Sequence, residues 1–265
     1  KGYAPESERH DGTSGTGFKI EGDESLDQVI VINADAKFEG IEVSHSLSSS
    51  YPAVSLRGTD YNFQTISDCL IYDTPQGIAT GNSFGGDNRL TVANTIIYNC
   101  DIGLDFTNAE WYPSPPLIYN VTVVNSGDRG IYESDNIKPE LKNVLVTGSE
   151  NGDIVSDNDR ITCNNCATSD ATADDHGGTG NQANQNFSFA DEANDDYRLS
   201  PGDKGAKDHG TDLSSDPNYA FSTDIEGDVR PFPSGGSWDI GADEVFHTRY
   251  EMNGQLQFEG RVEFK

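Results

Sequence analysis

The side chains in this sequence that are best suited to chemistry fall on two neighbouring predicted strands. Asp105 and Glu133 are carboxylates, and a pair of carboxylates can act as the acid and base of a glycosidase. Tyr132 and Arg129 complete the group, and a polysaccharide lyase needs such a base close to a cation. We expect Asp105 and Tyr132 to be neighbours one coil apart, with Arg129 and Glu133 near them. The alternative is a set of ordinary solvated residues on a sheet face.

Aromatic side chains offer a second kind of chemistry, which is binding without catalysis. Trp111 and Tyr112 lie in the longest interruption of the repeat described below, "NAEWYPSPP" (108–116). Rigid aromatics on such a loop suit stacking on a sugar ring or packing on a neighbouring subunit. A simple lid over the end of the fold is the other interpretation. Tyr72 and Tyr98 are further candidates for contact with a carbohydrate or a partner.

The elements that must position these residues recur along the chain. An Asn, Asp or Gly precedes a short β-branched run at Gly40, Asp68, Asn94, Asn120, Asn143 and Asn164, with intervals of 28, 26, 26, 23 and 21 residues. A second, out-of-phase set of short strands begins with a small residue and an aliphatic, as in "GIATGN" (77–82) and "GLDFTN" (103–108). Repeats of this length indicate a solenoid, and the alternation of apolar residues indicates strands rather than helices.

The alternation also predicts which side chains point inward. The expected core is a set of aliphatic ladders formed by Ile41/Val43, Cys69/Ile71, Thr95/Ile97, Val121/Val123, Val144/Val146, Val54/Leu56, Ile78/Thr80, Leu104/Phe106 and Ile131. The Asn column is expected to form a hydrogen-bonded polar ladder. The sequence therefore predicts an all-β, right-handed parallel β-helix of about six coils.

The outward positions of the first strand set form an unusual apolar stripe. They are Leu70/Tyr72, Ile96/Tyr98, Thr122/Val124 and Leu145. A patch of this size is normally covered. We expect the C-terminal part of the chain to fold back over it; an oligomer or host surface is the alternative.

Charge restricts the partners. Asp and Glu number 45 against 17 Lys and Arg, and the net charge of −28 argues against nucleic acid. The acidity suits solubility in a saline setting, and cation sites, with Ca²⁺ possible, are the alternative. No run of 18 apolar residues is present, so no membrane span is expected.

The four cysteines are too few for a disulfide scaffold. Cys69 falls on a core position. Cys163 and Cys166, in "CNNC", have the spacing of a redox or metal half-site, but no second pair of ligands accompanies them. They are interpreted as a local disulfide or as two thiols.

Two stretches near the C-terminus, "DDYRLSPGDKGAKDHG" (195–210) and "DIEGDVRPFPSGGSWDIGADEV" (224–245), resemble the closing region of bacterial and phage right-handed parallel β-helix proteins, pectate-lyase-like in fold. Lys204 to Lys207 stand where that group has an apolar "PAI". The resemblance implies the fold but no single activity, because the group includes lyases, hydrolases, adhesins and virion proteins. The matching residues are Tyr197, Leu199, Pro201, Gly202, Asp208 and Gly210, then Asp224, Gly227, Arg230, Asp239, Ile240, Gly241, Ala242 and Glu244.

The organisation expected from these observations has four parts. Residues 1–26 lead in, 27–167 form the coils, 168–249 form an irregular acidic loop and the closing region, and 250–265 form a terminal strand or hairpin, a possible anchor. The expected function is that of a non-catalytic extracellular or virion-surface attachment module, a homo-oligomer or part of a larger assembly, which binds carbohydrate through loop aromatics. A polysaccharide lyase or glycoside hydrolase acting on an extracellular polysaccharide is the alternative.

Overall fold

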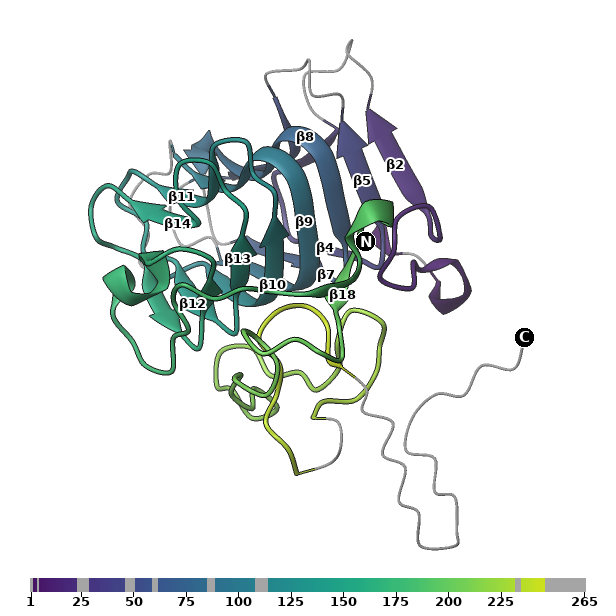
Figure 1. Cartoon of the computed structure of the whole chain (residues 1–265). Helices are drawn as coiled ribbons and strands as arrows, with labels where there is room; N and C mark the ends of the chain where they lie inside the picture. The colour runs from purple at the N-terminus through teal and green to yellow at the C-terminus, as the bar shows by residue number, and fades with distance from the viewer. Residues whose placement is uncertain are drawn as a thin grey trace, which may run out of the picture.

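Short parallel strands wind the chain into a β-solenoid of about five turns (Figure 1), which confirms the predicted fold with slightly fewer coils than expected. The computed structural model describes residues 2–3, 5–22, 29–45, 51–58, 62–84, 89–107, 114–231 and 235–245. The predicted terminal strand or hairpin at 250–265 lies outside these residues. None of the described helices is long and apolar enough to cross a membrane.

The strands stack into three parallel faces, here called sheets 1, 2 and 3. Long strands bend from one face to the next, so β8, β9 and β10 each contribute to more than one sheet. Sheet 1 consists of β1 (Gly2–Tyr3), β4 (Ala36–Glu39), β7 (Phe63–Ser67), the starts of β9 (Arg89–Phe106) and β10 (Leu117–Val124), β12 (Glu140–Lys142) and β15 (Thr162–Asn164). Sheet 2 consists of β2 (Lys19–Gly22), β5 (Glu42–His45), the start of β8 (Leu70–Phe84), the middle of β9, the end of β10, β13 (Leu145–Thr147) and β16 (Ala167–Thr168). Sheet 3 consists of β3 (Ile30–Ile32), β6 (Pro52–Gly58), the ends of β8 and β9, β11 (Arg129–Glu133) and β14 (Ile154–Ser156).

The interior of the solenoid is the predicted set of aliphatic ladders. Every predicted inward position is buried, and all but Thr80 and Thr95 belong to one continuous hydrophobic cluster. Successive strands place like residues in register, as in Val121 beside Thr95 and Val123 beside Ile97. Stacking therefore buries the aliphatic side chains of each turn against those of its neighbours.

The repeated Asn residues adopt a left-handed backbone conformation and also form side-chain hydrogen bonds. Asp68, Asn94, Asn120, Asn143 and Asn165 have φ between 44° and 54°, in the left-handed region that Asn and Asp tolerate better than other non-glycine residues. Asn94 Nδ2 donates to Asp68 Oδ1 (3.2 Å) and Asn143 Nδ2 to Asn120 Oδ1 (2.9 Å), so the predicted polar ladder is formed in two pairs. It is interrupted between them, because Asn94 Oδ1 and Asn120 Nδ2 have no hydrogen-bond partner among the described residues. In the last turn the left-handed residue is Asn165 and not the predicted Asn164, which lies in β15.

A second column of left-handed turns lies between sheets 2 and 3. Asp73, Asn99 and Asn125 have φ between 52° and 56°, and Gly148 continues the column with φ 76°. Each of these residues directly follows a strand segment of sheet 2 or interrupts a strand at that corner. In four successive turns, a left-handed residue therefore forms both the corner between sheets 1 and 2 and the corner between sheets 2 and 3.

The acidic stretch after β16, predicted to be an irregular surface excursion, instead covers the last turn of the solenoid. Ala173, in η2 (Thr172–His176), belongs to the solenoid core cluster, and His176 Nε2 lies 3.1 Å from the Ile154 oxygen. Gln182 forms an isolated parallel β-bridge with Ala167 of β16. Residues 170–183 are therefore called the cap. The difference arises because Ala173 and, in part, Ala183 pack on the apolar side chains at the end of the solenoid core and so remove them from water.

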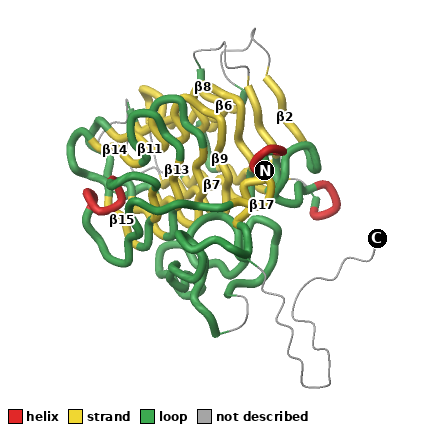
Figure 2. Tube along the Cα trace, viewed as in Figure 1, coloured by secondary structure: helices red, strands yellow, loops and turns green. Residues whose placement is uncertain are grey.

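The closing region, residues 187–231 and 235–245, folds back beside the solenoid mostly as loops (Figures 1 and 2). It contains β17 (Phe189–Asp191), η3 (Glu192–Asn194) and β18 (Asp196–Leu199). Outside this region, a short helix, η1 (Glu6–Glu8), lies near the N-terminus. The predicted apolar stripe on sheet 2 is buried beneath this region. Tyr197, Ile225 and Ala242 pack on its first part, and Leu199, Ala206 and Ile240 pack on Leu145. The first of the two expectations for the stripe is confirmed.

Candidate functional site

An open groove lies on the outer face of sheet 1. Side chains alternate along each strand, so Phe63 and Thr65 of β7 face outward while Ile66 enters the core. Register places Arg89 beside Phe63 and Thr91 beside Thr65 on the next strand. These four outward residues form the floor of the groove.

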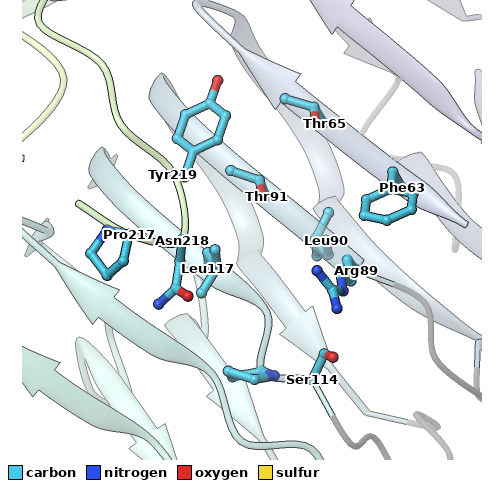
Figure 3. Close-up of a pocket in the computed structure, with 11 residues that line it drawn as sticks. Phe63, Thr65, Arg89, Leu90, Thr91, Ser114, Leu117, Pro217, Asn218 and Tyr219 are labelled. Carbon is cyan, nitrogen blue, oxygen red and sulfur yellow. The ribbon is translucent and has the colours of Figure 1, made fainter. Parts of the chain in front are cut away.

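Two other segments form its walls. Pro217, Asn218 and Tyr219 of the closing region stand on one side, and Ser114 and Pro115, which precede β10, stand on another (Figure 3). The groove has a volume of about 340 Å³, which is at the lower end of the range for small-ligand sites. It is thus assembled from residues far apart in the sequence.

The groove combines an exposed aromatic ring with a cation. Phe63 is 57% exposed, and the Arg89 guanidinium carbon lies 5.4 Å from its ring centroid. Exposure of more than half of a phenylalanine costs hydration free energy, since apolar surface stays in water. An exposed aromatic ring is suited to stack against an apolar face of a ligand.

The charged residues next to the groove are paired with one another, in part through Asp216 of the closing region. Lys142 Nζ lies 2.7 Å from both Glu140 Oε1 and Asp216 Oδ2. Burial alone would lower the pKa of Lys142, but the hydrogen bonds that Lys142 donates to these carboxylates outweigh burial and raise it. Tyr119 Oη donates to Glu140 Oε1 at 3.2 Å. Among the described lining residues Arg89 alone carries a charge and none is a carboxylate. The groove therefore offers hydroxyls, an amide, two aromatic rings and one cation, all of which can contact a polar ligand.

The predicted catalytic group lies on sheet 3 and is only partly assembled. Tyr132 pairs with Asp105 in register, as expected, and Arg129 stacks on the Tyr132 ring at 4.2 Å. Glu133, however, pairs with the core residue Phe106. Adjacent residues of a strand point to opposite faces, so Asp105 and Glu133 do not form the expected acid–base pair, and that prediction is wrong.

The environment of each carboxylate supports this conclusion. Asp105 is buried and accepts hydrogen bonds from Gln76 Nε2 (2.7 Å) and Thr107 N (2.9 Å), while burial raises its pKa. Glu133 is also buried, accepts a hydrogen bond from Ser156 Oγ (2.6 Å), and has a pKa raised chiefly by burial. Each carboxylate thus has a local structural partner on its own side of the sheet.

The predicted binding aromatics have different outcomes. Trp111 and Tyr112 lie outside the described residues, although Ser114 and Pro115 of the same loop line the groove. Tyr72 and Tyr98 are 7% and 1% exposed and stack with ring centroids 4.9 Å apart beneath the closing region. These two tyrosines are internal packing residues and do not offer a surface to a carbohydrate or a partner.

One group of carboxylates could supply oxygen ligands to a metal ion such as Ca²⁺. Asp224, Glu226 and Asp243 in the closing region each bring an oxygen within 4.8 Å of the others. Each already has a partner in the protein, because Glu226 Oε1 pairs with Arg198, Asp243 Oδ2 accepts from Leu199 N, and Asp224 accepts from backbone amides. Calcium binding therefore stays a prediction.

The motif residues at 224–244 hold the closing region together. Arg230 is buried and lies 3.1 Å from Glu244 Oε2, and its Nη2 donates to the Gly241 oxygen. Asp224 accepts from the amides of Glu226, Asp228 and Glu244, and Asp239 from those of Asp208 and Val245. These carboxylates satisfy backbone donors that have no strand partner. In this structure these residues therefore stabilise the closing region.

The groove residues were missed at the sequence level. Phe63 at an outward strand position was the one available signal, since a large exposed aromatic is unusual there. The contributions of Pro217, Asn218 and Tyr219 carry no local signal because the closing region brings them to sheet 1.

Comparisons with family models, curated proteins and solved structures found no match for this chain. The molecule is thus defined by its own geometry as a parallel β-solenoid with a capped last turn, a folded-back closing region and an outer groove on sheet 1. The resemblance to pectate-lyase-like proteins beyond the solenoid itself stays a prediction.

Proposed function

We propose that this protein is a non-catalytic attachment module that binds a glycan in the groove of sheet 1. The observation that carries the proposal is the exposed Phe63 ring beside Arg89, in a groove whose described lining includes hydroxyl and amide groups but no carboxylate. A sugar ring has an apolar face that can stack on an aromatic ring and hydroxyls that can bond to polar side chains at its rim. The acidic loops and solvated surface agree with an extracellular or virion-surface setting.

Replacement of the aromatic platform tests this proposal. Binding of the full chain to a panel of neutral and acidic polysaccharides is measured for the natural protein and for Phe63→Ala. We expect the variant to lose about tenfold or more in affinity for whichever glycan binds, since a central aromatic contact dominates such sites. Phe18→Ala is the matched control, because Phe18 is also exposed, at 51%, but does not line the groove.

Two results would contradict the proposal. If the protein releases new reducing ends or unsaturated uronates from the polysaccharides, with or without Ca²⁺, it is a hydrolase or a lyase, and the proposal of a non-catalytic module is wrong. Equal loss of affinity in Phe18→Ala and Phe63→Ala would place binding outside the groove. Native mass measurement on the same samples tests the accompanying proposal that the module works as a homo-oligomer or within a larger assembly.

A further inference from the structure

Two cysteines share one corner of the last solenoid turn. Cys163 lies in β15 and pairs with Leu141 of the preceding turn. Cys166 directly precedes β16 and is aligned with Val144 of the preceding turn. Both side chains are fully buried and both belong to the solenoid core cluster. The turn between them contains Asn165, whose φ of 52° bends the chain from sheet 1 to sheet 2. The two thiols therefore point into the same interior corner from either side of one tight turn.

The two sulfur atoms also interact. Hydrogen bonding with the Cys166 thiol is the largest cause that raises the pKa of Cys163, followed by burial. Cys166 Sγ lies 3.9 Å from the carbonyl oxygens of Leu141 and Asn164, so it points back across the turn.

The cap encloses this corner. Asn165 N donates to the Thr179 oxygen at 2.8 Å, and Cys166 N donates to Asn181 Oδ1 at 3.0 Å. Gly178 approaches the Cys163 carbonyl so closely that a Cβ atom would lie 1.7 Å from the oxygen, and its φ of 78° also requires glycine. The cysteine turn is thus the surface on which the cap rests.

Terminal turns are the weak points of a solenoid, because each has a neighbour on one side only. We propose that Cys163 and Cys166 form a disulfide that locks the last turn beneath the cap. This proposal is independent of glycan binding, and it concerns residues for which the sequence left a disulfide and two thiols open.

The reaction needs an oxidant, which we take to be a small-molecule disulfide such as oxidised glutathione. One cysteine thiolate attacks the glutathione disulfide and releases one glutathione thiolate. The second cysteine thiolate then attacks the mixed disulfide and releases the other. In sum two thiols lose two protons and two electrons, and one glutathione disulfide becomes two thiols. Because both sulfurs are buried in the folded protein, the bond is expected to form while the last turn assembles.

The chain contains its own matched control. Register aligns Ile66 with Cys163 and Cys69 with Cys166 on an earlier turn, so Cys69 occupies the same kind of corner with an isoleucine opposite it. Cys69 and Cys100 are buried as well, but register places Cys100 beside Thr74 and not beside Cys69, so neither has a cysteine at its own corner. We expect both to stay reduced.

Refolding and peptide mapping test the proposal directly. The reduced protein is refolded in a glutathione redox buffer, its remaining thiols are alkylated under denaturing conditions, and it is digested with trypsin. Residues 161–198 form one fragment with both Cys163 and Cys166, while Cys69 and Cys100 fall on two others. We expect the 161–198 fragment to be unalkylated and lighter by two hydrogen atoms than its reduced form, and the other two to be alkylated. An alkylated 161–198 fragment, or a bond between different fragments, would overturn the proposal.

Thermal melting gives a second readout. Reduction should lower the melting temperature of the oxidised protein by about 5 °C, as expected for a short disulfide loop. The same treatment should leave the double variant Cys163→Ala/Cys166→Ala unchanged, whereas Cys69→Ala should keep the full effect. Equal melting of the oxidised and reduced natural protein would show that the bond does not lock the turn, and the peptide map decides the bond itself even if the double variant fails to fold.

Discussion

The solenoid and the closing region reach order by opposite means. In the solenoid, strand pairing satisfies nearly every backbone group, and aliphatic side chains fill the interior. In the closing region, side-chain carboxylates take over the work of strand partners. Asp203 Oδ1 alone accepts hydrogen bonds from the amides of Gly205, Ala206 and Lys207. The comparison teaches that a chain with few aliphatics can build a fixed structure by polar contacts, provided that each buried charge has partners.

The two regions should therefore fail differently when they are perturbed. Loss of an aliphatic side chain from the solenoid leaves a cavity whose cost is spread over a stack of similar turns. Loss of one member of a buried polar network leaves its partners without compensation. We therefore expect a single substitution to destabilise the closing region more than the solenoid.

The largest effect is expected from Arg230→Met. Arg230 is buried with Glu244, so its removal leaves an uncompensated carboxylate, at a cost of about 3–5 kcal/mol in the free energy of unfolding. Trp238, a buried residue of the closing region, reports on it by fluorescence in a Trp111→Phe background, since these are the two tryptophans of the chain. We expect the fluorescence transition in urea to move to lower denaturant and to precede the far-UV circular dichroism transition of the solenoid.

Glu244→Gln provides the control for this prediction. Glutamine keeps an acceptor for the Asp239 amide, which now donates to Glu244 Oε2 at 2.9 Å, but it carries no charge. The double variant Arg230→Met/Glu244→Gln should therefore be more stable than Arg230→Met alone. Coincident and unmoved transitions in Arg230→Met would show that the closing region does not depend on its buried ion pair.

A smaller effect is expected from pH, again mainly in the closing region. Burial raises the pKa of Asp224 to about 7, against about 4 in an unfolded chain. The folded state then binds this proton more tightly, so its contribution to stability is present at low pH and is lost as pH rises from about 4 to about 7. We expect the melting temperature, followed through Trp238, to be several degrees higher near pH 5 than near pH 8.

Reduced self-repulsion of the acidic chain acts in the same direction, so variants must separate the two causes. Asp224→Asn should flatten the pH dependence. Asp68→Asn, at a solenoid turn, should flatten it less, because burial raises the pKa of Asp68 to only about 6. Equal pH dependence in the natural protein and both variants would show that neither Asp224 nor Asp68 causes the effect, and would assign it to net charge or to Asp239 and Asp243, whose pKa values burial also raises.

The same contrast explains what could be predicted from the sequence. The core ladders and the repeated Asn column were predictable because each occurs several times, so a weak local pattern is reinforced by repetition. Two predictions failed for local reasons. In "CNNC" two consecutive Asn residues leave the turn position ambiguous, and Glu133 is a carboxylate at a position that alternation makes internal.

The candidate site was less predictable than the fold. Its floor follows from strand alternation once the register is known, and Phe63 and Arg89 could have been paired in that way. Its wall could not, because Tyr219 is held beside sheet 1 by long-range contacts: its amide donates to Asp216, which pairs with Lys142 of β12, and its ring packs on Phe221. Such single, long-range contacts leave no periodic trace in a sequence.

The smallest effect is expected at the turns of the solenoid, where the comparison is sharpest. Asn99 has a φ of 52°, is only partly buried, and donates to Asp73 Oδ1 at 3.3 Å in an exposed hydrogen bond. Asn99→Ala should cost about 1 kcal/mol in the free energy of unfolding, since alanine is strained in the left-handed region. Asn99→Gly should cost less than Asn99→Ala, because glycine adopts this conformation without strain. Urea unfolding followed by far-UV circular dichroism measures both. If Asn99→Gly lowers the free energy of unfolding as much as Asn99→Ala, the hydrogen bonds of the Asn side chains, and not the backbone conformation, explain the repeated Asn. The solenoid would then resemble the closing region in its dependence on polar side-chain partners.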